Sequence, residues 1–236
     1  MTALPAAKGG GGSHAVDAGR VRAVVFDLGG VFLAGGPGEV RAFGPRHGLS
    51  QEHWDAIRQD LFVAGDLWGQ VERAELSLEE FGQILQSRMA GHGVPVTLAD
   101  ALDFMGTPGE AGRMPLRQEI VDACLALRAR MPTALLTNNI REWRAGWRAR
   151  LPVERLFDVV VDSSEAGCRK PEPRIYELTE KQLGLPGAGL LFVDDLGVNL
   201  KAARERGWQT VKYEDTATVL GVLNHVIAQH PPRRGY

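Results

Sequence analysis

The chain has 236 residues, of which 44% are hydrophobic and 24% are charged, a composition typical of a globular protein with a sizeable core. At roughly 150 residues per domain, this length predicts one or two domains that need neither disulfides nor metal ions for stability. Lys and Arg total 27 and Asp and Glu total 29, a formal net charge of -2, which excludes the strongly basic surface that nucleic acid or an anionic membrane requires.

The absence of long apolar runs and the spacing of the cysteines indicate the cellular compartment. No apolar run approaches the ~18 residues of a membrane span, and the N-terminus lacks the basic and then apolar stretch of a signal peptide. The two cysteines, Cys124 and Cys168, lie in no zinc or redox spacing and predict reduced thiols. We therefore expect a cytoplasmic protein with no nucleic-acid or membrane partner. Nothing in the sequence favours one oligomeric state over another.

The first predicted element is a strand that follows a flexible tail. Residues 1–20 are Gly-rich and aperiodic, include a linker-like GGGGS, and predict a disordered tail. Residues 21–32, VRAVVFDLGGVF, form a β-branched apolar run that reaches an Asp and two glycines. This pattern predicts a buried parallel strand with a tight turn at its carboxyl end.

Helical periodicity dominates the next segment, residues 36–112. Apolar residues recur at helical spacing in 53–63 and 76–89, and Ser77 with Glu80 has the spacing of a capping box. We predict an inserted all-helical cap of three or four helices, with the GGPG at 35–38 as its hinge. An insertion after the first strand would cover the crevice at the strand ends and exclude water from it.

Strand and helix patterns alternate through residues 113–230. This alternation predicts an α/β fold, a doubly wound parallel sheet that residues 21–35 and 113–230 build together, with a site at the carboxyl ends of its strands. Trp143 and Trp147, four residues apart, are expected to pack inward from one helix. Residues 231–236 are expected to fray. The predicted strands are 133–137, 157–162, 190–195 and 208–213, and the predicted helices are 116–130, 141–151, 173–184, 199–207 and 216–228.

Polar residues with complementary chemistry follow the predicted strands. Asp27 ends the first strand, Thr137 and Asn138 end the second, and Asp194 and Asp195 end the fourth, while Lys170 precedes a helix that starts near residue 173. Carboxylates are the ligands that Mg2+ prefers, and hydroxyl, amide and ammonium groups bind phosphoryl oxygens. The sequence therefore predicts a Mg2+ site and a phosphoryl site at one edge of the sheet.

The order of these residues resembles the four motifs of the haloacid dehalogenase superfamily of aspartate-nucleophile hydrolases. The words FDLGGV, LLTNN, CRKPEPRIYE and FVDDLGVNLKAARERG are most similar to the phosphatase-type branch that includes the N-terminal domain of soluble epoxide hydrolases. The resemblance covers residues 21 to about 213. It implies a Rossmann-like core, a helical cap, a Mg2+ cofactor, a small phosphorylated substrate and a phosphoaspartyl intermediate.

The resemblance also implies a role for each matching residue. Asp27 matches the nucleophile, Thr137 the phosphate-binding hydroxyl, and Lys170 the motif lysine that contacts both nucleophile and phosphate. Asp194 and Asp195 match the metal-binding acids, which Asp27 and the backbone carbonyl of Gly29 would complete. Asn138, Gly30 and Asn199 are the further candidates for phosphate binding.

Gly29 departs from the family pattern, which places a second Asp there as general acid and base. Such assistance is typically worth ~10²- to 10⁴-fold in rate. Three interpretations follow: a phosphatase whose substrate has a good leaving group, such as an anomeric or acyl phosphate, or whose proton comes from water or from a cap residue; a metal-independent dehalogenase; and a non-catalytic phosphate-binding module. His47 and His53 lie in the predicted cap and are candidate proton donors, although each also fits a surface or packing role.

Overall fold

A single parallel sheet organises the part of the chain that the computed structural model describes, residues 16–34, 38–103 and 115–233. The strand order is β3-β2-β1-β4-β5, so β1 lies at the centre and pairs with β2 and β4. The strands are β1 Ala23–Phe26, β2 Thr133–Thr137, β3 Val159–Asp162, β4 Leu190–Asp194 and β5 Gln209–Lys212. This confirms the predicted α/β class and parallel sheet.

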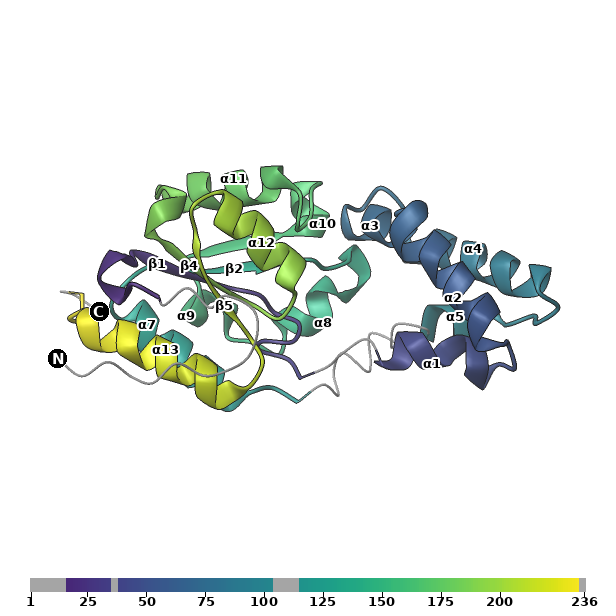
Figure 1. Ribbon diagram of the computed structural model, residues 1–236, viewed down its shortest axis with the longest axis horizontal. Coiled ribbons are helices and arrows are strands. Elements are labelled where there is room, and N and C mark those ends of the chain that lie inside the picture. Colours follow the sequence, from purple (N-terminus) through teal and green to yellow (C-terminus); the bar gives the residue numbers. More distant parts are fainter. Residues whose placement is uncertain (1–15, 35–37, 104–114, 234–236) are drawn as a thin grey trace.

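Helices cover both faces of the sheet. Figure 1 shows α11 and α12 on one face and α7 and α13 on the other, with α1 to α5 grouped beside this core. The core helices are α7 Gln118–Arg128, α8 Arg144–Arg148, α9 Val153–Leu156, α10 Ser163–Ala166, α11 Pro173–Leu183, α12 Gly197–Glu205 and α13 Thr216–Gln229, and the inserted helices are α1 Gly38–Arg46, α2 Gln51–Gln59, α3 Leu67–Glu72, α4 Leu78–Gly91 and α5 Leu98–Asp103. Short 3-10 turns lie at Ala18–Arg20, Arg141–Trp143 and Gly187–Gly189, and a π-helical turn, Asp60–Ala64, follows α2.

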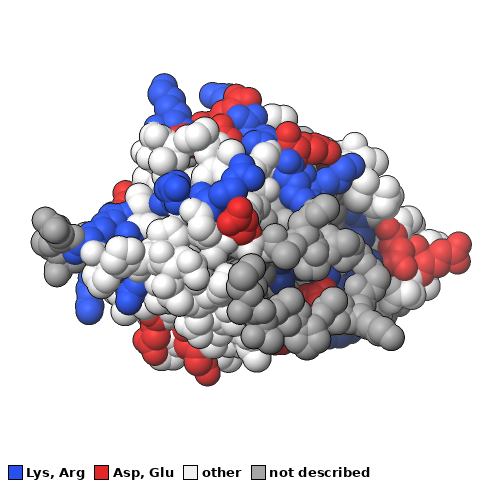
Figure 2. All heavy atoms as spheres, turned by 60° about the vertical axis from the view of Figure 1, so that its left-hand side comes forward, with Lys and Arg blue, Asp and Glu red and all other residues white. Residues whose placement is uncertain are grey.

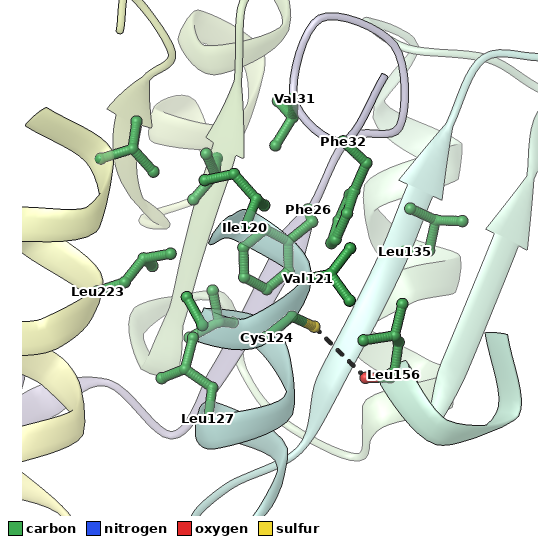
Figure 3. Packing of buried hydrophobic residues seen from close by; sticks show 14 of the residues in the cluster. Phe26, Val31, Phe32, Ile120, Val121, Cys124, Leu127, Leu135, Leu156 and Leu223 are labelled. Carbon is green, nitrogen blue, oxygen red and sulfur yellow. Dashed lines mark hydrogen bonds between the residues drawn. The ribbon is translucent and has the colours of Figure 1, made fainter. Parts of the chain in front are cut away.

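The central strand β1 is buried on both faces because its side chains alternate between two hydrophobic clusters. Val24 and Phe26 pack against α7 and α13, whereas Ala23 and Val25 pack toward α11 and α12. Figure 3 shows the first cluster, in which Phe26 lies among side chains of α7. A strand buried on both sides needs an apolar residue at every position, and the sequence AVVF meets that need.

Residues 38–103, which we call the cap segment, have a hydrophobic cluster of their own. Its members include Trp54, Phe81 and Leu85, which are all fully buried. The predicted capping box is confirmed at the start of α4, where the Ser77 hydroxyl accepts from the Glu80 N–H and the Glu80 carboxylate accepts from the Ser77 N–H. The number of helices was underestimated, because the described part of the insertion contains five α-helices instead of three or four, separated by short turns and by the π-helical turn after α2.

The two connections between the cap segment and the core lie against each other. Leu33 forms an antiparallel bridge with Leu116, and the Ala34 N–H donates to the Pro115 carbonyl at 2.9 Å. The Arg117 guanidinium donates to the carbonyls of Gly30 at 2.6 Å and Val31 at 3.0 Å. The return connection therefore holds the turn that follows β1. Of the predicted hinge, residues 35–37 lie outside the described residues.

Two further predictions need correction. Residues 16–20 belong to the folded core rather than to the predicted tail, because Ala18 is buried and the Asp17 N–H donates to the Gln209 side chain at 2.6 Å. The predicted helix over 141–151 forms over 141–148, as the 3-10 turn Arg141–Trp143 that runs directly into α8, and only Trp147 packs in the core cluster, whereas Trp143 packs against the cap cluster. Residues 1–15 of the predicted tail and 234–236 of the predicted frayed end lie outside the described residues.

The surface and the helices agree with the composition. On the face shown in Figure 2, basic and acidic side chains of the described residues are interspersed and form no continuous basic area. Among the described residues, no helix combines the length and the apolar composition that a membrane crossing requires. Both cysteines are buried free thiols.

Candidate active site

A buried lysine bridges two carboxylates at the carboxyl edge of the sheet. Asp27 follows β1 and Asp194 ends β4, and because these strands are neighbours, the two side chains lie side by side. Lys170 Nζ lies 2.8 Å from Asp27 Oδ1 and 2.7 Å from Asp194 Oδ2. The lysine side chain is only 1% exposed, so the two carboxylates compensate its buried charge.

Burial and charge set the protonation of this group. Burial raises the pKa of Asp27 to about 7, with Lys170 opposing the rise and Asp194 adding to it. Burial lowers the pKa of Lys170, but the attraction of Asp194 and Asp27 outweighs it, so the lysine pKa is raised overall. Lys170 therefore stays protonated at neutral pH and favours the ionised form of the Asp27 carboxyl.

Three carboxylates gather around this lysine. Asp27, Asp194 and Asp195 each offer an oxygen, and these oxygens lie within 4.8 Å of one another. Burial and the neighbouring Asp194 raise the pKa of Asp195, which is the expected result of crowding anions without enough positive charge. One ammonium against three carboxylates leaves an excess of negative charge, and all the clustered ligands are oxygens, so the residues fit a hard divalent cation such as Mg2+.

The two glycines after Asp27 differ in what they require. A Cβ on Gly30 would lie 2.3 Å from Asp195 Oδ2, and its φ of +74° favours glycine. The Gly30 N–H donates to the Leu33 carbonyl at 2.9 Å, so the visible role of this residue is to leave room for Asp195. A Cβ on Gly29 would meet nothing within 4 Å. Phosphate contact by Gly30 and metal ligation by the Gly29 carbonyl remain predictions.

Asn199 lies behind Asp194. Its Nδ2 is 3.1 Å from each carboxylate oxygen of Asp194, and the Leu196 N–H donates to Asp194 Oδ1 at 2.7 Å. The Tyr176 hydroxyl donates to the Asn199 carbonyl at 3.0 Å and so helps to hold this residue in place. In this arrangement Asn199 orients the Asp194 carboxylate, and its contact with phosphate stays a prediction.

Thr137 and Asn138 occupy the end of β2, next to β1. The Thr137 side chain is buried and its hydroxyl donates weakly to the Asn138 carbonyl, at 3.4 Å. The Asn138 side chain forms two hydrogen bonds with the backbone of Lys170: Nδ2 donates to the lysine carbonyl at 2.9 Å, and Oδ1 accepts from the lysine N–H at 2.8 Å. Thr137, Asn138 and Lys170 thus lie together as the sequence predicts, but the Asn138 amide supports the lysine in this structure.

The structure adds a residue that the sequence analysis missed, Glu72 of the cap segment. Its carboxylate pairs with Arg169, accepts from Trp68 Nε1 at 3.0 Å, and lies 3.4 Å from Asn138 Nδ2. No spacing signal identifies such a residue, because its partners lie across the boundary between cap segment and core. By contrast, the His47 and His53 rings pack on Phe43 and His92, both within the cap segment, with ring centroids 4.5 Å apart.

Comparisons with known proteins agree on the family. The sequence model of the haloacid dehalogenase-like hydrolases matches residues 21–207. The chain is 33% identical over 87% of its length to mouse acyl-CoA dehydrogenase family member 10, and 36% identical over 45% of its length to pig bifunctional epoxide hydrolase 2. It spans only about a fifth of the length of each (19% and 20%). Phosphoglycolate phosphatase of Yersinia pestis is 25% identical over 79% of the chain and 78% of that protein.

Solved structures share the fold. A HAD family enzyme from Bacteroides thetaiotaomicron, solved in complex with magnesium and inorganic phosphate, superposes with a TM-score of 0.61 at 21% identity. The match covers 84% of this chain and 98% of that one.

Proposed function

Because this chain belongs to the haloacid dehalogenase-like hydrolases, we propose that it is a Mg2+-dependent phosphatase that acts on a small phosphorylated metabolite through a phosphoaspartyl intermediate on Asp27. One observation carries the proposal: Lys170 Nζ bridges Asp27 and Asp194 beside a cluster of three carboxylate oxygens. Relatives with phosphatase names and a magnesium- and phosphate-bound structural neighbour support the same activity.

The chain's own residues account for most of the chemistry. A carboxylate oxygen of Asp27 attacks phosphorus in line, a phosphorus–oxygen bond forms, and the bond to the leaving oxygen breaks. Lys170 offsets the repulsion between this carboxylate and the phosphate dianion, and Thr137 and the turn after Asp27 would bind the non-bridging oxygens. Water then attacks phosphorus, which releases inorganic phosphate and restores Asp27. Bound Mg2+, held by Asp27, Asp194 and Asp195, would neutralise phosphoryl charge.

The carboxylate cluster also favours a phosphatase over a dehalogenase. Displacement of halide from carbon uses the same aspartate but needs neither a cation nor a proton for the leaving group. The crowding of Asp195 against Asp194 has no purpose in that reaction, and burial together with this crowding raises the pKa of Asp195 at a cost in folding free energy. The phosphatase therefore explains a feature that the dehalogenase leaves without a role.

The test is phosphate release from a panel of phosphomonoesters that includes sugar 1-phosphates and acyl phosphates, with and without Mg2+. We expect Mg2+-dependent turnover that Asp27→Asn abolishes. Halide release from 2-haloacids without metal would support the dehalogenase instead. Absence of turnover across the panel, with Mg2+ and phosphate still raising the melting temperature, would refute the phosphatase and support a phosphate-binding module.

Gly29 gives the proposal a sharper test. Since a Cβ there meets nothing within 4 Å, an aspartate fits and would supply the absent proton donor. We expect Gly29→Asp to raise turnover of alkyl phosphates, which have poor leaving groups, by roughly 10- to 100-fold while acyl phosphates change little. Gly29→Asn is the matched control, with the same shape and no proton to give. If Gly29→Asp leaves alkyl phosphate turnover unchanged or lower, the native site already has its own donor.

A further inference from the structure

Glu72, the last residue of α3, places a carboxylate of the cap segment beside the catalytic lysine. The residue is buried, at 8% exposure. Its oxygens meet three donors: Trp68 Nε1 at 3.0 Å, Asn138 Nδ2 at 3.4 Å, and the Arg169 guanidinium. Trp68 belongs to the cap segment, whereas Asn138 and Arg169 belong to the core, so Glu72 joins the two parts at a single carboxylate.

Both core partners of Glu72 are connected to Lys170. Arg169 is its neighbour in the chain, and the Asn138 amide holds the lysine backbone from two sides, at 2.8 and 2.9 Å. The Asn138 Nδ2 group has two hydrogens, of which one serves the lysine carbonyl and the other faces Glu72. The position of the Asn138 amide, and with it the lysine backbone, therefore depends on the docked carboxylate.

We propose that Glu72 is a positioning residue supplied by the cap segment, which sets the place of Lys170 Nζ between Asp27 and Asp194 through Asn138 and Arg169. The inference rests on the proposed function, since it concerns the lysine of that reaction. When the cap segment docks on the core, Glu72 also aligns Lys170 Nζ. The lysine is therefore correctly placed only when the cap segment covers the substrate site.

A role for Glu72 in proton transfer is the competing assignment. Burial raises the pKa of Glu72, and Arg169 and Trp68 oppose the rise; both carboxylate oxygens already face N–H donors, which hold the side chain in place, as a positioning role requires. A proton donor would need one of these oxygens to face the leaving group instead. The two roles differ in kinetics, because loss of a proton donor harms poor leaving groups most, whereas misplacement of Lys170 harms all phosphates alike.

The first experiment compares Glu72→Gln with Glu172→Gln in the full chain with Mg2+, using acetyl phosphate and phenyl phosphate. Glu172 is a matched control because it also pairs across the boundary, with Arg73 at 3.0 Å, and Arg73 holds neither Asn138 nor Lys170 in the contacts of the described residues. We expect Glu72→Gln to lower kcat at least 10-fold for both substrates, with KM changed less than 3-fold. Glu172→Gln should leave kcat within 2-fold.

A double-mutant cycle tests the route through Asn138. We expect Asn138→Ala to lower kcat, and Glu72→Gln to cost several-fold less in that background than in the wild type, because only the route through Arg169 remains. Additive losses would overturn the proposal. A loss with Glu72→Gln that is several-fold larger for phenyl phosphate than for acetyl phosphate would also overturn it, because that pattern belongs to proton transfer.

Hydrogen exchange gives a readout that needs no turnover. The Lys170 amide donates to Asn138 Oδ1, so Glu72→Gln should speed its exchange at least 10-fold, while Glu172→Gln and the β1 amides serve as controls. Unchanged exchange would overturn the positioning role even if the enzyme is active, whereas an inactive wild-type chain would refute only the proposed function. If circular dichroism shows that Glu72→Gln does not fold, Arg169→Gln replaces it, since that change leaves the Trp68 contact with Glu72 intact.

Discussion

At the scale of single residues, the two adjacent glycines after Asp27 have opposite tolerance for a side chain. Gly30 has a positive φ and its Cβ would collide with Asp195, whereas Gly29 has open space. We expect Gly30→Ala to destabilise the protein by roughly 1–3 kcal/mol and to weaken Mg2+ binding by at least 10-fold, because Asp195 must move.

Gly29→Ala is the matched control for that prediction and should stay within about 0.5 kcal/mol of the wild type. Thermal unfolding and a Mg2+ titration by calorimetry measure both effects. Equal losses in the two variants would show that the turn is sensitive to any side chain and would remove Asp195 from the explanation.

The buried Asp27 carboxyl also predicts a dependence of folding stability on pH. Because burial raises the folded-state pKa of Asp27 from 3.8 to about 7, its ionisation costs folding free energy; the cost is absent below about pH 4 and complete above about pH 7. Without divalent cations, Asp27→Asn should therefore be more stable than the wild type at pH 8, by on the order of 2 kcal/mol.

This advantage should shrink as the pH falls from 7 to 4, and denaturant unfolding across that range measures it. Mg2+ at pH 8 should stabilise the wild type more than Asp27→Asn, because it pairs with the ionised carboxylate. A difference between the two proteins that is constant with pH would contradict the raised pKa.

At the scale of elements, the stability of the cap segment depends on the hydrogen bonds at the N-terminus of α4. Ser77 and Glu80 satisfy N–H groups at this helix end, and the Glu142 side chain of the core accepts from the Leu78 N–H at 3.2 Å. We expect Ser77→Ala to cost about 1 kcal/mol and to speed hydrogen exchange in α4 before exchange in the core strands. Ser87→Ala, at an exposed position inside the same helix, should be neutral within about 0.5 kcal/mol. Equal exchange in the two variants would contradict the capping role.

Elements with a local pattern were predictable, and those that depend on distant contacts were not. The strand over 133–137 forms as Thr133–Thr137, and the helix over 173–184 forms as Pro173–Leu183, because apolar periodicity and flanking residues specify each. The helix over 141–151 forms over 141–148, as a 3-10 turn that runs into α8, but its two tryptophans have different partners: Trp143 packs against Trp68 of the cap segment, and Trp147 packs into the core. The apolar periodicity of one segment does not show that two of its side chains contact different parts of the molecule.

The same distinction holds within the site. The meeting of Asp27, Lys170 and Asp194 follows from the rule that parallel strands deliver their carboxyl ends to one edge. The part played by Glu72 depends on how the cap segment docks, and the commitment of the Asn138 amide to Lys170 depends on the loop path before α11. Neither is encoded in spacing along the chain.

At the scale of the whole molecule, Arg117 connects the return connection of the cap segment to the turn that follows Asp27. Its guanidinium donates to the carbonyls of Gly30 and Val31 and lies 4.5 Å from the centre of the Tyr213 ring. We expect Arg117→Lys to destabilise the protein by roughly 1–2 kcal/mol and to lower kcat several-fold, because a lysine lacks the planar fork.

Arg22→Lys is the control for this prediction, since Arg22 donates to the carbonyls of Gly19 and Val21 far from the site. Urea unfolding and steady-state kinetics separate the two expected effects. Loss of stability without loss of kcat would restrict Arg117 to a structural role.

The central position of β1 has a consequence for the order in which the chain folds during synthesis. Val24 pairs with Thr133 and with Leu191, so β1 leaves the ribosome before both of its neighbours, and its second edge is covered only after Leu191 has been synthesised. The helices of the cap segment contact one another over short sequence separations, and such local contacts form fastest. The inserted helices can therefore complete their own core while β1 is still unpaired, which leaves the edges of β1 open to misassociation in the nascent protein.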